Sequence, residues 1–218
     1  MTRRRLRAMT RQGDALRAGF QAVRDEQNVP ATFPPDILAD AARVAADPRP
    51  ALRSKRRRDL TDVPFVTIDP AGATDLDQAV HIGRQGTGYR VQYAIADVAA
   101  FVRPGSALDE ETHRRGVTLY SPDLRTPLHP PTLSEDAASL LPGVDRPAVV
   151  WRIDLDSTGL PVEVDVERAL VRSRAQLSYL EVQHALDDGT ADEALALVRE
   201  VGLRRTELEI ARGGIDVR

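Results

Sequence analysis

The chain has 218 residues, 42% of them hydrophobic, which is enough for one large domain or two small ones. It contains no cysteine, which excludes disulfides, a disulfide-linked partner and thiolate metal sites. Residues 1–60 hold 14 Arg and Lys against 7 Asp and Glu, a net charge of +7, whereas the remainder holds 16 against 26, a net charge of −10. The basic start favours either a polyanion partner or a solvated tail.

No apolar run approaches the roughly 18 residues of a membrane span, and no apolar segment follows the basic N-terminus as in a secretory signal. We therefore expect a cytoplasmic protein without a membrane partner. Two stretches, RRRLR and RSKRRR, are either an RNA-binding arm or a product of Arg-rich composition, because only one of the 30 cations is a lysine.

Residues 14–27 predict a short amphipathic helix, and FPPDILADAARVAADP predicts a second helix with Pro35 in its first turn. RPALRSKRRRDLTD, which follows, is a candidate linker. We therefore expect a helical, basic N-terminal extension over residues 1–60 and a second domain over residues 61–218.

The second domain begins with strand signals. FVTI, DLDQAVHI and YRVQYAIADVAAFV each predict a strand, with a turn at PAGA and a hairpin loop at GRQGTG. Residues 103–147 are rich in Pro and predict a long irregular segment. AVVWRIDLD and PVEVDVERALVRSRA predict a hairpin around STGL.

The end of the chain is predicted to be helical. LSYLEVQHALDDG carries a capping box, with Ser178 three residues before Glu181, and the segment after it has Thr190 three before Glu193. Gly202 lies inside the second helical pattern and argues against one unbroken helix there.

The stretch TIDPAGATDLDQAV crowds Asp69, Asp75 and Asp77 beside apolar residues. In a strand, Asp75 and Asp77 point to the same side, and the PAGA turn can fold Asp69 back towards them. Three converging carboxylates suit Mg²⁺, and a pair of such ions can clamp an attack on a phosphodiester. The alternative is that these aspartates cap turns.

A rival metal motif is DLDSTG, where Asp154 to Asp165 imitates a calcium loop. Strands rather than helices are predicted on both sides of it, and Pro161 interrupts it, so a hairpin turn is the favoured interpretation.

The acidic stretch resembles the RNB catalytic domain of the ribonuclease II and ribonuclease R family, which has T-I-D-P-x-x-A-x-D-x-D-D-A where this chain has TIDPAGATDLDQA. YAIADVAAFVRPGSALDEETHRRGVTLYSPD and TPLHPPTLSEDAASLLPGVDRPAVV resemble later motifs of the family. The resemblance runs from about residue 60 to the end of the chain.

The resemblance implies an α/β (α+β) fold with a mixed β-sheet and flanking helices. It implies a 3′-to-5′ exoribonuclease that uses Mg²⁺, or Mn²⁺ in its place, and degrades single-stranded RNA to nucleoside 5′-monophosphates. Asp69, Asp75 and Asp77 match its metal ligands, with Asp77 the most critical, and Tyr120 matches the tyrosine that stacks on the 3′-terminal nucleotide. Asp97 matches a family position for which we expect a structural role.

Two departures qualify the match. The family's fourth carboxylate is Gln78 here, whose amide oxygen can still bind Mg²⁺ but without charge. The family's later arginine and S-P-x-R-R-Y motif have no counterpart, so we expect either a fragment of a longer product or a truncated relative. The alternatives are an RNA-binding module that has lost turnover and a structural β-rich domain with calcium; no oligomeric state is assigned.

Overall fold

The structure, a computed structural model, describes the backbone of residues 2–52 and 57–215, and the side chains from residue 13 onwards within those ranges. The side chains of RRRLR and most of RSKRRR lie outside the described residues. The chain forms two compact units, one of residues 1–43 and 102–131 and the other of residues 44–101 and 132–218. Each unit is therefore assembled from two separate stretches of the chain.

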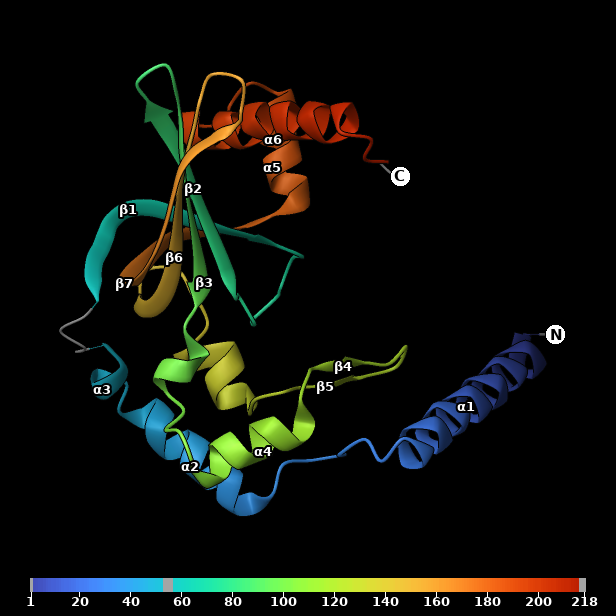
Figure 1. Cartoon of the computed structure of the whole chain (residues 1–218). Coiled ribbons are helices and arrows are strands. Elements are labelled where there is room, and N and C mark those ends of the chain that lie inside the picture. The colour runs from blue at the N-terminus through green and yellow to red at the C-terminus, as the bar shows by residue number, and fades with distance from the viewer. Residues whose placement is uncertain (1, 53–56, 216–218) are drawn as a thin grey trace. The chain divides into compact units, whose positions relative to one another are not determined.

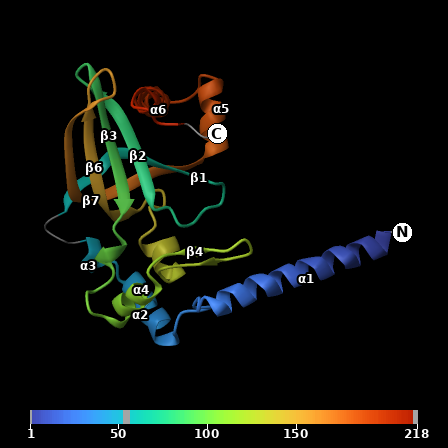
Figure 2. The same ribbon diagram turned by 45° about the vertical axis from the view of Figure 1, so that its right-hand side comes forward.

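The larger unit is built on a closed sheet in the strand order β1-β2-β3-β6-β7 (Figure 1). Its strands are β1 (Arg58–Asp69), β2 (Gln78–Gln85), β3 (Gly88–Ala96), β6 (Asp145–Leu155) and β7 (Pro161–Ser178). Neighbouring strands are antiparallel except β1 and β7, which pair in parallel and close the ring. The sheet is thus mixed, and the helices of this unit flank it, as predicted (Figure 2).

The interior of the closed sheet is aliphatic apart from one phenylalanine. Its buried residues are Leu60, Phe65, Leu76, Ala79, Ala94, Leu140, Ala148, Val150, Ala169 and Val171. Leu76 is fully buried although aspartates flank it on both sides. The acidic stretch therefore contributes one core side chain.

Short elements precede β1 or lie between the later strands. They are α3 (Arg49–Leu52), η1 (Val98–Ala100) and the π-type turn η2 (Leu133–Ala137). Within its described residues, the candidate linker forms α3 and the start of β1.

The predicted hairpin between β6 and β7 is confirmed. The carboxylate of Asp156 accepts backbone hydrogen bonds from Thr158 (2.8 Å) and Leu160 (3.0 Å), which closes the turn. The carboxylate of Asp154 receives two bonds of 2.7 Å from Arg90 instead of facing a loop. The Asp156 carboxylate closes the turn and the Asp154 carboxylate binds Arg90 on β3, so the calcium-loop alternative is wrong.

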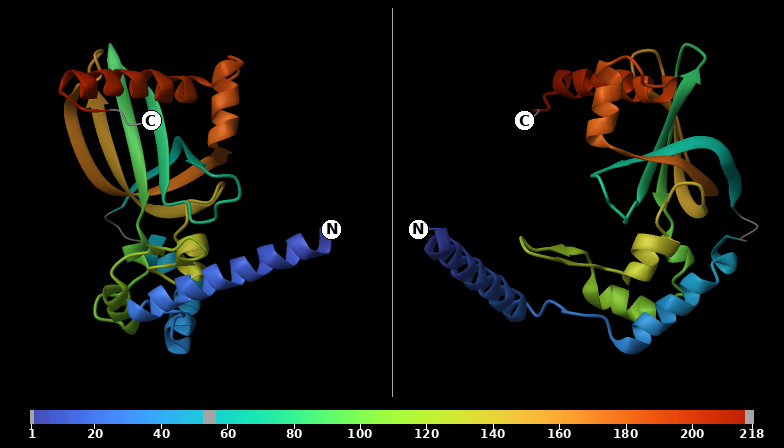
Figure 3. Two further views of the ribbon diagram at one scale, coloured as in Figure 1. Left: turned by 90° about the vertical axis from the view of Figure 1, so that its right-hand side faces the viewer. Right: turned by 180° about the vertical axis from the view of Figure 1, so that it is seen from behind.

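Two helices end the unit, α5 (Tyr179–Asp187) and α6 (Glu193–Ala211) (Figure 3). Ser178 and Glu181 form the predicted capping box of α5. The cap of α6 is Asp192 and not Thr190, because the Asp192 carboxylate accepts the Leu195 N–H at 2.8 Å. Gly202 does not interrupt α6, since Leu197 and Val201 bury the same face against β2.

The smaller unit contains α1 (Thr2–Glu26), α2 (Pro35–Ala46, whose last turn belongs to the larger unit), α4 (Ala107–Arg115), and a short hairpin of β4 (Leu119–Tyr120) and β5 (Arg125–Thr126). Both predicted N-terminal helices are confirmed, although α1 is longer than expected. The prediction of an irregular segment over residues 103–147 is wrong in part. Ser106 caps α4 by accepting the Asp109 N–H, and Gly116 ends it with φ of 76°.

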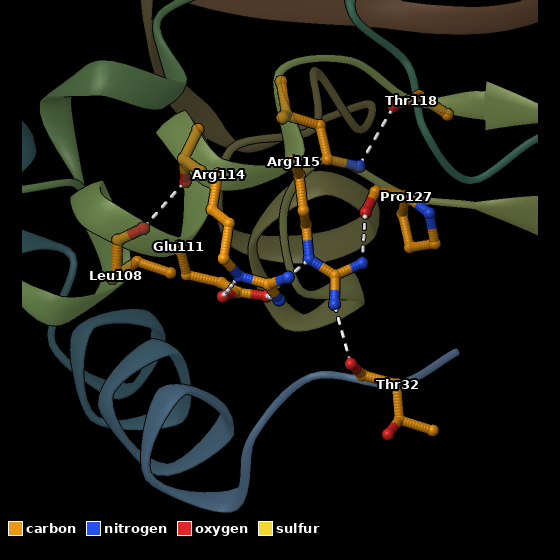
Figure 4. Close-up of polar contacts among 9 residues, drawn as sticks. Thr32, Leu108, Glu111, Arg114, Arg115, Thr118 and Pro127 are labelled. Carbon is orange, nitrogen blue, oxygen red and sulfur yellow. Dashed lines mark hydrogen bonds and ion pairs between the residues drawn. The ribbon is translucent and has the colours of Figure 1, made fainter. Parts of the chain in front are cut away.

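Arg115 ties the smaller unit together (Figure 4). Its guanidinium bonds the carboxylate of Glu111 (2.8 Å), the carbonyl of Thr32 (2.7 Å) and the carbonyl of Pro127 (3.2 Å). It also lies over the ring of Phe33, 3.6 Å from the centroid. One buried cation thus joins the segment after α1, helix α4 and the residue that follows β5.

No helix within the described residues has the length and apolar character needed to cross a membrane.

Candidate active site

The three motif aspartates lie between the end of β1 and the beginning of β2. Asp69 is the last residue of β1, whereas Asp75 and Asp77 lie in the irregular segment 73–77 that precedes β2. The predicted strand through both residues is therefore wrong, since β2 begins only at Gln78. The alternation still holds locally, because Leu76 is buried while Asp75 is half-buried and Asp77 exposed.

Hydrogen bonds from distant residues hold this segment in place of a strand ladder. The Ser139 hydroxyl donates to the Thr74 carbonyl (2.7 Å) and accepts the Leu76 N–H (3.0 Å). The Leu140 N–H donates to the Leu76 carbonyl (2.8 Å). Ser139 lies within the motif TPLHPPTLSEDAASLLPGVDRPAVV but was not predicted to belong to the site.

The aspartates act on one another electrostatically. Partial burial raises the pKa of Asp69, and the charges of Asp77 and Asp75 raise it further. Loss of hydration also raises the pKa of Asp77, although its surface is exposed, and Asp75 adds to the effect. Like charge is therefore among the causes that raise both pKa values.

Gln78 and Tyr93 lie beside the aspartates. The Tyr93 hydroxyl donates a hydrogen bond to Oε1 of Gln78. Loss of hydration raises the pKa of Tyr93, followed by the charges of Asp77 and Asp69. Tyr93 is thus a second neighbour that sequence reasoning missed, because only the register of β2 against β3 brings it there.

An open pocket of about 410 Å³ adjoins Asp69. Its wall includes the turn after β1, Gln176 on β7 and Ser178 at the start of α5. The Gln176 side-chain amide donates to the Ala73 carbonyl at 2.7 Å, which ties the turn to β7. Asp69 therefore borders both the acidic segment and a space open to solvent.

The donor set suits a hard cation. Carboxylate oxygens are the ligands that Mg²⁺ prefers, and like charges that raise one another's pKa are stabilised by an opposite charge among them. Among the side chains that the structure describes, no three Asp, Glu or His groups are already arranged around a metal position. The assignment of Asp69, Asp75, Asp77 and Gln78 as ligands stays a prediction.

Tyr120 belongs to the smaller unit and is 77% exposed. It pairs with Arg125 across the β4–β5 hairpin, and Leu119 and Leu124 beside it are also exposed. Tyr120 is therefore not a packing residue of the smaller unit's core. Its ring is available to stack on a flat partner.

Comparison with known proteins follows these observations. Residues 57–217 match the RNB domain. Ribonuclease R of Acidithiobacillus ferrooxidans is 37% identical over 173 residues, which are 78% of this chain and 39% of that protein. The Arabidopsis thaliana protein named inactive exonuclease DIS3L2 is 40% identical over 167 residues, 74% of this chain and 15% of that one.

The fold is similar to that of Mycoplasma genitalium RNase R in complex with ribose methylated single-stranded RNA. The TM-score is 0.78 at 27% identity, over 89% of this chain and 31% of that one. The chain therefore spans about two fifths or less of the length of each of these proteins.

Proposed function

Because the chain belongs to the RNB-domain exoribonuclease family, we propose that it carries the acidic half of a Mg²⁺-dependent 3′-to-5′ exoribonuclease site. The substrate would be single-stranded RNA and the product nucleoside 5′-monophosphates, formed in the cytoplasm. The observation that carries the proposal is the mutual effect of the motif aspartates: the charges of Asp77 and Asp75 raise the pKa of Asp69, and the charge of Asp75 raises the pKa of Asp77.

The aspartates would hold the metal, with Mn²⁺ as a substitute. When bound, the ion supplies Lewis-acid chemistry and lowers the pKa of its water. The contribution of this chain would be to present the carboxylates at the end of β1 and just before β2. Gln78 would supply an uncharged oxygen, and its bond from Tyr93 would hold the side-chain amide in one orientation.

Tyr120 would receive a base of the RNA. Stacking on an aromatic side chain contributes roughly 1–3 kcal/mol per base and tolerates any sequence, which suits a nuclease without base preference. Its high exposure leaves the ring accessible.

A second candidate function is an RNA-binding module without turnover. It is favoured by Gln78, which replaces the family's fourth carboxylate, and by the relative named inactive exonuclease DIS3L2. Both candidates predict binding of single-stranded RNA, so only the fate of the RNA separates them.

The test is incubation of the chain with 5′-labelled single-stranded RNA and Mg²⁺. The variants are Asp77→Asn and, as a matched control, Asp62→Asn, which changes an exposed aspartate on β1. A ladder of shortened RNA with wild type and Asp62→Asn but not with Asp77→Asn supports the nuclease. Binding without shortening supports the module, and no binding contradicts both.

A further inference from the structure

One buried hydroxyl group forms hydrogen bonds to the backbone on both sides of Asp75. Ser139 is 1% exposed, and its Oγ is bonded on one side to the Thr74 carbonyl and on the other to the Leu76 N–H. These are the two residues that flank Asp75. One side chain therefore uses both its donor and an acceptor lone pair to fix the peptide groups around a motif aspartate.

Two backbone hydrogen bonds hold the next two residues of the segment. The Leu76 carbonyl accepts the Leu140 N–H at 2.8 Å, and the Asp77 carbonyl accepts the Ala96 N–H at 2.9 Å. Residues 73–77 belong to no strand; the Ala96 bond extends the β2–β3 pairing by one residue, and the Leu140 bond comes from far along the chain. Ser139 and Leu140 act as a short edge against which the acidic segment lies.

Ser139 is itself fixed by the buried Arg146. The Arg146 Nε donates to the Ser139 carbonyl (2.9 Å), and its Nη2 donates to the Asp136 carbonyl (3.2 Å). The Ser139 N–H donates to the Asp136 carbonyl at 3.1 Å, at the end of η2. A guanidinium buried with backbone carbonyls as its partners holds one geometry, so the hydroxyl has little freedom to follow a moving segment.

We propose that Ser139 is a positioning residue that keeps the carboxylates of Asp75 and Asp77 close enough to bind one divalent cation. Like charges favour separation, and an irregular segment can give way to that repulsion unless its backbone is held. Holding the peptide groups in advance means that the cation does not have to order them, which raises its affinity. The inference rests on the proposed function, since it assumes that the aspartates bind a metal.

The experiment is Mn²⁺ binding to the 218-residue chain, measured by calorimetry and by loss of the free-ion paramagnetic resonance signal, without RNA. Ser139→Ala removes both bonds, and we expect Mn²⁺ affinity to fall by about 10-fold, as for other residues that orient metal ligands. The matched control is Ser173→Ala. Ser173 is also buried, and its hydroxyl donates to the Ala175 carbonyl (3.1 Å), away from the acidic segment, so wild-type affinity is expected.

Equal affinity of Ser139→Ala and wild type overturns the inference and leaves the proposed function standing. Absence of Mn²⁺ binding to wild type overturns both. If circular dichroism shows that Ser139→Ala is unfolded, Ser139→Cys replaces it, because a thiol keeps the shape but is a weak donor and acceptor. Weaker Mn²⁺ binding by folded Ser139→Cys supports the inference, and unchanged binding refutes it.

Discussion

The Arg57 guanidinium and the Asp97 carboxylate are buried together, 2.8 Å apart from Nη2 to Oδ2, with side chains 6% and 4% exposed. Arg57 stands just before β1 and also donates to the Ala51 carbonyl at 3.0 Å, whereas Asp97 follows β3. The pair therefore links the N-terminal end of β1 to the C-terminal end of β3. A structural role for Asp97 agrees with this geometry.

Asp97→Ala should destabilise the larger unit by about 3–5 kcal/mol, because it leaves a buried cation unpaired. The check is urea unfolding followed by circular dichroism. Asp62→Ala is the control, since Asp62 is an exposed aspartate on β1 and should change stability by less than about 0.5 kcal/mol. Equal effects of the two substitutions would contradict the structural role.

Leu76→Ala should cost about 2–5 kcal/mol, because a fully buried side chain is lost and a cavity remains inside the closed sheet. Val162→Ala on the exposed part of β7 is the comparison. Thermal unfolding of both variants measures the difference. A mild effect of Leu76→Ala would mean that the acidic segment is not anchored through this residue.

Asp77→Asn should make the chain more stable than wild type at pH 7. Folding raises the pKa of Asp77, so the folded chain binds more protons at this site than the unfolded chain does. The free energy of unfolding therefore falls as the pH rises from the unfolded pKa of about 3.9 towards the raised value. The destabilisation caused by the ionised Asp77 carboxylate persists at neutral pH, and the uncharged amide of the Asp77→Asn side chain removes it. Unfolding midpoints of both proteins from pH 7 down to pH 4 should converge; a constant difference would count against this origin.

Tyr120→Ala should weaken binding of single-stranded RNA by roughly 1–3 kcal/mol, as expected for one lost stacking contact. Its thermal midpoint should stay at the wild-type value, because the side chain is largely exposed. Tyr120→Phe keeps the ring and should bind like wild type. Fluorescence anisotropy with a labelled RNA tests this, and equal losses in both variants would rule out stacking.

Arg115→Ala should lower the free energy of unfolding of the smaller unit by about 3 kcal/mol. The buried Glu111 carboxylate loses one of its cations, and the carbonyls of Thr32 and Pro127 lose their hydrogen-bond donor. Hydrogen exchange of the amides in α4 measures this locally. Arg43→Ala, whose exposed pair with Asp40 contributes little, is the control. Unchanged protection of α4 in Arg115→Ala would refute the central role of this residue.

Two features that depend only on residues close together in the sequence were predicted. The Ser178 cap and the β6–β7 turn were predictable because the groups that bond lie within four residues of one another. The α6 cap shows the limit of such rules, since Thr190 and Asp192 are both good capping residues and only the structure shows which N–H is reached.

Long-range contacts explain what the sequence could not predict. Leu76 is buried between two aspartates, but the Ser139 hydroxyl that holds its N–H comes from 63 residues away. Ser139 lies within the quoted motif TPLHPPTLSEDAASLLPGVDRPAVV, but nothing in that motif shows which backbone groups its hydroxyl reaches. The parallel closure of β1 on β7 is hidden for the same reason.

That closure has a consequence for synthesis. The first residue of β1, Arg58, pairs with Ala169, so one edge of the ring has no partner until more than a hundred further residues have been made. At the usual elongation rates this delay lasts about 5–20 s. During that time the emerging strand presents an open edge on the ribosome, where chaperones or premature pairing with other chains compete with correct folding.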